Sequence, residues 1–133
     1  MLEAWSDKIR YQFDQRIAAL CFYSRILLLQ GFADRAMRIA ASALEDALAI
    51  DHPISILFAL FHGASVALLA GDLPAAEGFV KMLLGLSVKH GVNVWNVIGR
   101  CFKGALLIKR DDVVAGLQEL LPRLLVCPGW PFT

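Results

Sequence analysis

Histidine is the residue type in this chain best suited to acid–base chemistry, and it occurs three times, as His52, His62 and His90. His52 and His90 fall near predicted turns between helices, where an imidazole often meets the terminal carbonyls. His62 lies in an uncharged apolar stretch close to Phe58 and Phe61, so it could face a groove. A general base needs a partner group, and no acidic pair, nucleophile motif or metal-ligand spacing accompanies it. We therefore expect a non-catalytic chain in which His62 lines a core or a groove.

Cofactor and nucleic-acid chemistry are equally unsupported by motifs. The sequence has no glycine-rich phosphate loop of the GxxxxGK[ST] kind, no acidic Walker-like strand and no helix-turn-helix with a basic recognition helix. Thirteen basic and twelve acidic side chains give a net charge of +1, without a basic run. Such a balance argues against direct binding of DNA or RNA. We expect no cofactor, no metal ion and no nucleic-acid partner.

A repeat with a period of 40 residues predicts the elements that carry these side chains. Small residues recur at that offset in two sets, 12 positions apart: Ser24, Ala64 and Gly104, then Ala36, Ala76 and Gly116. Between the two sets lie the turn residues Gly31, Gly71 and Asp111. Small residues at this spacing let two antiparallel helices approach closely across a short turn, and such units bury their apolar faces by stacking. The sequence predicts an all-α fold, an α-solenoid of three antiparallel helix pairs.

Glycine, proline and aspartate mark the ends of six predicted helices. The expected helices span about 12–30, 34–50, 53–70, 73–90, 93–110 and 113–124. They group into a single domain, 12–125, with repeats of about 12–51, 52–91 and 92–125. Residues 1–11 are expected to be an extension or the remnant of a preceding helix, and 126–133 a carboxy-terminal tail. That tail resembles a truncation, a fragment boundary or a changed reading frame.

Composition points to a globular chain in the cytoplasm. The chain has 133 residues, of which 58% are hydrophobic and 19% charged, enough for one domain with a core. Charged residues from Glu3 to Arg10 interrupt any secretory signal. Cys21, Cys101 and Cys127 are odd in number and widely spaced, as expected of reduced thiols. Cys21 and Cys101 stand two periods apart and are expected in the core.

The stretch from Pro53 to Gly71 carries no Lys, Arg, Asp or Glu and is about long enough to cross a membrane. The aligned stretches 13–31 and 93–111 contain several charged residues, among them Arg25 and Lys103. Because the three stretches are versions of one element, we expect a helix that is packed on several sides rather than a membrane span.

A small residue, a glycine turn seven positions later and another small residue five positions after that resemble the tetratricopeptide repeat over about residues 12–125. The period of 40, longer than the usual value of about 34, is similar to arrays in large bacterial regulators. The sequences of four segments resemble the carboxy-terminal helical region of bacterial STAND/AAA-type ATPase transcriptional regulators. These segments are Phe13-Asp14-Gln15-Arg16, Leu29-Gln30-Gly31-Phe32-Ala33-Asp34-Arg35-Ala36, Leu69-Ala70-Gly71-Asp72 and Gly99-Arg100-Cys101-Phe102-Lys103-Gly104. In that family, nucleotide-binding and DNA-binding domains precede repeats that sense a signal or partner.

The resemblance implies a right-handed superhelix that serves as a non-catalytic protein-interaction or regulatory module. The first helix of each pair would line the concave side, which makes the following residues candidate groove contacts: Arg16, Tyr23, His62, Trp95, Asn96, Arg100 and Lys103. The alternative is a domain that senses a small-molecule effector in the groove near His62 and Trp95.

The sixth predicted helix carries an apolar face that a further repeat would cover. Its residues Leu117, Leu120 and Leu124 are therefore candidates for self-association through an uncapped solenoid end. In the competing arrangement, Trp130 and Phe132 fold back over this helix as a cap. Both arrangements follow from the same excess of apolar surface.

Overall fold

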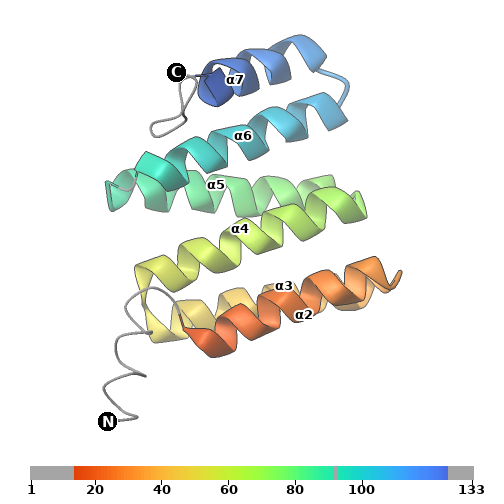
Figure 1. The fold of residues 1–133 in the computed structure, drawn as a ribbon, viewed down its shortest axis with the longest axis vertical. Helices are drawn as coiled ribbons and strands as arrows, with labels where there is room; N and C mark the ends of the chain where they lie inside the picture. Colours follow the sequence, from red (N-terminus) through yellow and green to blue (C-terminus); the bar gives the residue numbers. More distant parts are fainter. Residues whose placement is uncertain (1–13, 92, 126–133) are drawn as a thin grey trace.

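The computed structural model of the chain describes residues 14–91 and 93–125, and it contains six α-helices in this part. They are α2 (Gln15–Leu29), α3 (Ala33–Ile50), α4 (Pro53–Ala70), α5 (Leu73–Lys89), α6 (Asn93–Lys109) and α7 (Val113–Leu125) (Figure 1). Consecutive helices run antiparallel and pack in pairs along the chain. The all-α prediction and the predicted pairs are confirmed. The expected extension 1–11, the tail 126–133, Cys127, Trp130 and Phe132 lie outside the described residues.

Left-handed backbone marks the turns between the helices. Among the described residues it occurs at steps of 20, at Gly31, Asp51, Gly71, Gly91 and Asp111. After the first, third and fifth of these, the next N–H donates to a carbonyl five residues back, over 2.9 Å in each case, from Phe32 to Leu27, Asp72 to Ala67 and Asp112 to Leu107. This is the hydrogen bond that closes a helix at a left-handed residue. The predicted turns at Gly31, Gly71 and Asp111 are confirmed.

Aspartate side chains start three of the helices. The carboxylate of Asp72 accepts from the N–H of Ala75 at 3.2 Å, and that of Asp112 from Ala115 at 3.3 Å, as the sequence predicted. Asp14 accepts from the N–H of Arg16 at 2.9 Å. Because Asp14 is the amino-terminal cap of α2, this helix begins at Gln15 and not at residue 12 as expected.

The predicted small residues lie where the two helices of each pair meet. Ser24 of α2 and Ala36 of α3 are both fully buried, as are Ala64 of α4 and Ala76 of α5. A Cβ atom added at Gly104 of α6 would lie 2.9 Å from the carbonyl oxygen of Gly116 in α7. The helix backbones therefore approach most closely at these positions, because no side chain of any size separates them.

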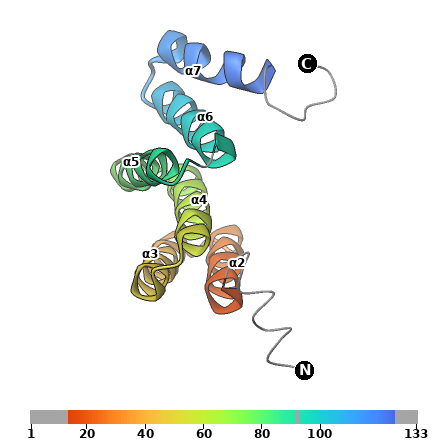
Figure 2. The same cartoon turned by 90° about the vertical axis from the view of Figure 1, so that its left-hand side faces the viewer.

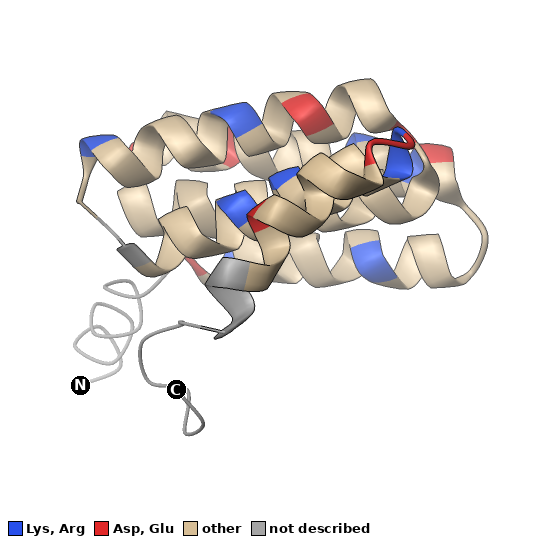
Figure 3. Ribbon diagram, turned by 90° about the horizontal axis from the view of Figure 1, so that it is seen from above, with Lys and Arg blue, Asp and Glu red and all other residues tan. Residues whose placement is uncertain are grey.

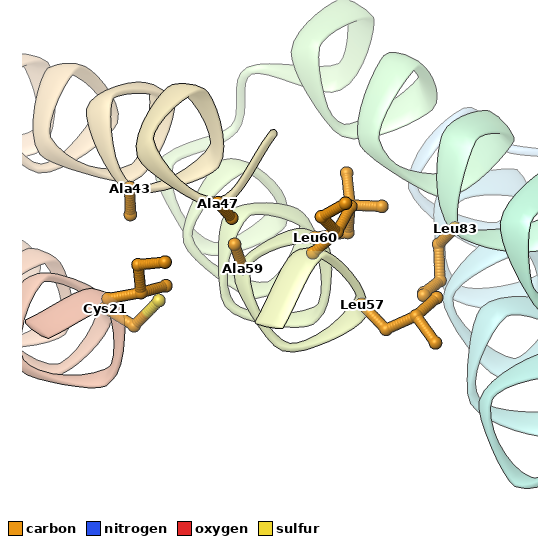
Figure 4. Packing of buried hydrophobic residues seen from close by; sticks show 9 residues of the cluster. Cys21, Ala43, Ala47, Leu57, Ala59, Leu60 and Leu83 are labelled. Atoms are coloured by element: carbon orange, nitrogen blue, oxygen red, sulfur yellow. The ribbon is translucent and has the colours of Figure 1, made fainter. Parts of the chain in front are cut away.

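Helix α4 is the centre of the described structure, packed against α2, α3, α5 and α6. In Figure 2, α3 and α5 lie on one side, apart from each other, and α2, α4 and α6 follow one another on the other. The largest core cluster joins α4 to its neighbours, with Ala59 facing Ala47 of α3 and Leu57 facing Leu83 of α5 (Figure 4). The expectation that the helix after Pro53 is packed on several sides is confirmed.

The same helix is the one described segment that is long and apolar enough to cross a membrane, by length and composition alone. Of the 18 residues of this helix, 61% are buried inside the fold. Core helices of soluble proteins meet the same criterion, since both environments select continuous apolar sequence. The expectation that the chain does not enter a membrane remains a prediction.

Candidate binding site

Aromatic rings from three helices form a continuous row across the side of the molecule where α2, α4 and α6 lie. We call this set the aromatic row: Phe22 of α2, Phe58, Phe61 and His62 of α4, and Trp95 and Phe102 of α6. The ring of Phe61 links the helices, with its centroid 6.1 Å from that of Trp95 and 5.5 Å from that of Phe102. Both contacts are edge-to-face, the geometry in which the electron-poor ring edge meets the electron-rich face.

His62 is the polar member of the row. Its ring centroid lies 4.5 Å from that of Phe58 and 5.4 Å from that of Phe22. The residue is only 5% exposed, and its Nδ1 has no hydrogen-bond partner among the described residues. Burial and, to a lesser degree, the nearby charge of Arg25 lower the pKa of His62 to about 4. The imidazole is therefore neutral at neutral pH.

Arg25 brings a positive charge to the row from the next turn of α2. Its guanidinium carbon lies 5.9 Å from the centroid of the Phe61 ring, within range of a cation–π contact. Its Nε is buried and lacks a hydrogen-bond partner in the described part of the chain. Buried polar groups are usually satisfied, so an orphaned guanidinium N–H beside an orphaned imidazole nitrogen is a notable pair.

Exposed apolar side chains extend the row along α2. Phe22, Ile26 and Leu29 stand one helical turn apart and are 55%, 51% and 85% exposed. Tyr23 lies beside them and is also exposed. The α2 helix therefore presents a stripe of large apolar side chains to solvent, next to the row of aromatic rings.

Two of the groove contacts expected from the sequence meet in the row, since Phe61 packs against both His62 and Trp95. Tyr23 is exposed on α2 at its edge. Arg16 lies at the start of α2, where its Nη2 is 3.6 Å from Oδ2 of Asp46 in an exposed ion pair.

The remaining expected contacts link neighbouring helices. Asn96 donates from Nδ2 to Ser87 Oγ of α5 at 3.3 Å. Arg100 and Lys103 of α6 lie 3.7 and 3.6 Å from the two carboxylate oxygens of Glu119 in α7. These side chains lie on the same helix as Trp95 and Phe102 of the row, but the contacts that they make are with α5 and α7.

The leucines expected at a self-association face have different environments. Leu117 is 41% exposed, whereas Leu120 is half-buried and packs beside Gly104 of α6. The side chain of Leu124 lies outside the described part of the structure. Val113, Val114 and Leu121 add exposed apolar surface on α7.

The described residues contain no candidate metal site, and the thiol of Cys21 is buried. No group of three His, Cys, Asp or Glu side chains is placed to hold a metal ion in residues 14–91 and 93–125. Cys21 is buried and Cys101 half-buried, so the core prediction is confirmed for the first and holds in part for the second. Burial raises the pKa of Cys21 to about 12, which leaves a neutral thiol.

The other notable polar group is the Ser55–His52 pair at the start of α4. Ser55 Oγ accepts from the N–H of Asp14 at 2.8 Å and lies 2.8 Å from Nδ1 of His52. The hydroxyl oxygen has two lone pairs, so the tautomer of His52 decides whether Nδ1 accepts from Ser55 Oγ or donates to it. Since Ser55 is fully buried, this pair ties the start of α2 to the start of α4 and offers no accessible nucleophile.

Sequence reasoning missed Phe22, Arg25 and Phe102 as members of the site. A signal for two of them exists, because Phe22, His62 and Phe102 are separated by one period of 40 residues each. Aromatic rings at one register position of successive helix pairs are placed to meet across the α2, α4 and α6 side.

No family model, no curated protein and no solved structure matches this chain.

Proposed function

We propose that this chain is a non-catalytic protein-interaction module of the tetratricopeptide-like solenoid type, acting in the cytoplasm as part of a signalling or transcriptional regulator. A partner segment binds across α2, α4 and α6, the first helices of the three pairs. The observation that carries the proposal is the exposed stripe of Phe22, Ile26 and Leu29, which is continuous with the half-buried rings of the aromatic row.

The energetics favour this surface as a binding site. Large aromatic and aliphatic side chains supply most of the free energy at protein interfaces, because each removes a large apolar area from water. The half-buried rings of the row are already ordered by edge-to-face contacts. Their side chains therefore lose little conformational entropy when a partner binds to them. Preorganised rings beneath exposed anchors are what a peptide-binding groove requires.

The charge distribution supports a protein partner over a nucleic acid. Lysine and arginine are scattered among aspartate and glutamate over the described helices (Figure 3). Several of the cations have carboxylate neighbours, as Arg16 does in Asp46 and Lys81 in Glu77. Phosphate backbones are bound by cations that are grouped and available, so this arrangement favours an apolar mode of recognition.

The test is a selection of binding peptides from a display library with the full chain as bait, followed by affinity measurement on purified variants. Phe22→Asp places a charge in the stripe and is expected to weaken the selected peptides at least tenfold. Val88→Asp is the matched control, since Val88 is an exposed apolar residue on α5, outside the row. Peptides that bind both variants with the same affinity as the original chain would place the interaction elsewhere. A selection that yields no specific binders would contradict the proposal.

A further inference from the structure

Two buried nitrogen atoms beside the aromatic row have no hydrogen-bond partner among the described residues: Nε of Arg25 and Nδ1 of His62. They come from adjacent helices, and Arg25 is close enough for its charge to lower the pKa of His62. The imidazole of His62 packs against Phe22, Phe58 and Phe61, and the guanidinium of Arg25 lies over the same Phe61 ring. A ligand that forms hydrogen bonds with both nitrogens gains affinity, because these buried polar groups are already in place and unsatisfied by the described residues.

The charge of Arg25 has no carboxylate partner among the described residues. By contrast, Arg16, Arg100 and Arg110 each have a carboxylate within 4 Å. The positions one and two periods after Arg25 hold Ser65 and Ala105, which carry no charge. The cation is therefore specific to the α2–α4 end of the aromatic row, in a place where its water shell is partly removed.

We propose that the α2–α4 end of the aromatic row receives an aspartate or glutamate side chain of the partner peptide, flanked by a large apolar residue. The carboxylate accepts from Nε of Arg25 and from Nδ1 of His62 in the tautomer that carries its hydrogen there. The flanking residue packs on Phe22 and Ile26. This inference rests on the proposed function and specifies the partner that the surface recognises.

The number of charges selects a carboxylate over a phosphate. One guanidinium neutralises one negative charge, and the neutral imidazole adds a donor without adding charge. A phosphate dianion would bring a second negative charge into a surface of aromatic rings, where desolvation is costly. Phe22 is the most exposed ring in contact with His62, so it forms the solvent side of this end of the row.

The experiment uses defined probes on the full chain: acetyl-Leu-Glu-Phe-amide, its glutamine twin acetyl-Leu-Gln-Phe-amide, and the twin with phosphoserine at the centre. Affinities are measured at pH 7 by nuclear magnetic resonance titration, with the ring signals of His62 as a local reporter. The glutamate peptide is expected to bind about tenfold more tightly than the glutamine peptide and to shift the His62 signals, since hydrogen bonds to charged groups are the strong ones.

Arg25→Gln is expected to reduce the glutamate peptide to the affinity of its glutamine twin. Arg35→Gln is the matched control, because Arg35 on α3 also lies over a phenylalanine ring, 5.5 Å from the centroid of Phe32, away from the row. The comparison of the three peptides on the unchanged chain needs no variant, so a folding defect in Arg25→Gln leaves the test intact.

Equal binding of the glutamate and glutamine peptides, tighter binding of the phosphopeptide, or no binding of any of them at millimolar concentration overturns the inference. The proposed function fails separately, through the display selection. Selected peptides that depend on Phe22 but need no acidic residue would leave the interaction module standing and remove the carboxylate site.

Discussion

The first and last helix pairs share one register but are held together in different ways. In α2–α3, Ser24 Oγ donates to the carbonyl oxygen of Ala36 at 2.7 Å, and Ile17, Cys21 and Leu27 are buried beside it. In α6–α7, glycines stand at the corresponding positions, and Leu106 is the one buried large hydrophobic residue among the described side chains of these two helices. Ion pairs of Glu119 with α6 add to that contact.

The difference shows that a helix pair can be stabilised by buried side-chain volume or by close backbone approach. A contact that is filled by large side chains loses most stability when one of them is deleted, because a cavity remains. Small additions destabilise it only where the packing leaves no free space. Close backbone approach is sensitive to the smallest addition, a single methyl group, because there is no flexible atom to move aside. The two pairs should therefore respond to opposite kinds of substitution.

The largest effect is expected from a deletion in the core that joins α4 to its neighbours. Leu60→Ala removes a fully buried side chain and should lower the free energy of unfolding by about 2–5 kcal/mol. Leu117→Ala on α7 removes a side chain that is 41% exposed and should change it by about 0.5 kcal/mol or less. Urea denaturation followed by circular dichroism measures both, and equal losses would mean that the core around α4 and the exposed face of α7 contribute alike to stability.

A pH-dependent difference of about 2 kcal/mol is expected from His62, after allowance for solvent screening. Its pKa in the folded chain is lowered from 6.5 to about 4, mainly by burial, so the unfolded chain binds more protons between these values. The contribution of the neutral imidazole to stability is complete above about pH 6.5 and is lost as the pH falls toward 4.

The measurement compares unfolding at pH 7 and pH 4 for the original chain and for His62→Phe, which places at this position the residue found one period away on either side. The loss between the two pH values should be smaller in the variant. An identical pH dependence in both chains would mean that His62 titrates in the folded state as it does in the unfolded state.

The smallest effect sharpens the comparison from the α6–α7 side. A Cβ at Gly116 would lie 2.7 Å from the carbonyl oxygen of Gly104 and would also meet Ile108. Gly116→Ala should therefore lower the unfolding free energy by about 1–2 kcal/mol, overpacking outweighing the helix propensity that alanine adds. Gly78→Ala on α5, where a Cβ meets no atom within 4 Å, should raise it by about 0.5–1 kcal/mol. A stabilising Gly116→Ala would show that the two backbones can separate at little cost.

Sequence reasoning located the turns and the helix contacts because both depend on local chemistry. Gly31 and Gly71 stand where the backbone is left-handed, and Asp72 and Asp112 cap the helices that follow. A residue that ends or starts a helix acts through its own backbone or its nearest neighbours. These features are therefore visible in the chain without knowledge of the fold.

The candidate site was predictable only in part, because its contacts depend on how helices are rotated against each other. His62 and Trp95 were expected near one groove, and Phe61 does bring them together. Arg100 lies on the same helix as Trp95, but its guanidinium extends toward Glu119 of α7. Arg25 was not singled out, since a charged residue in an apolar helix gives no sign of which ring it will cover.

The left-handed residues at steps of 20 have a consequence for how such a chain can change in length. Inserting one residue inside a helix turns everything after it by about 100° and moves its apolar face away from its neighbour. Copying residues 52–91 after Gly91, by contrast, adds one complete antiparallel helix pair. The helices that follow keep their direction and the orientation of their apolar faces. Gene duplication in blocks of two turns is thus the structurally silent route to a longer array, and single-codon insertions are confined to the turns.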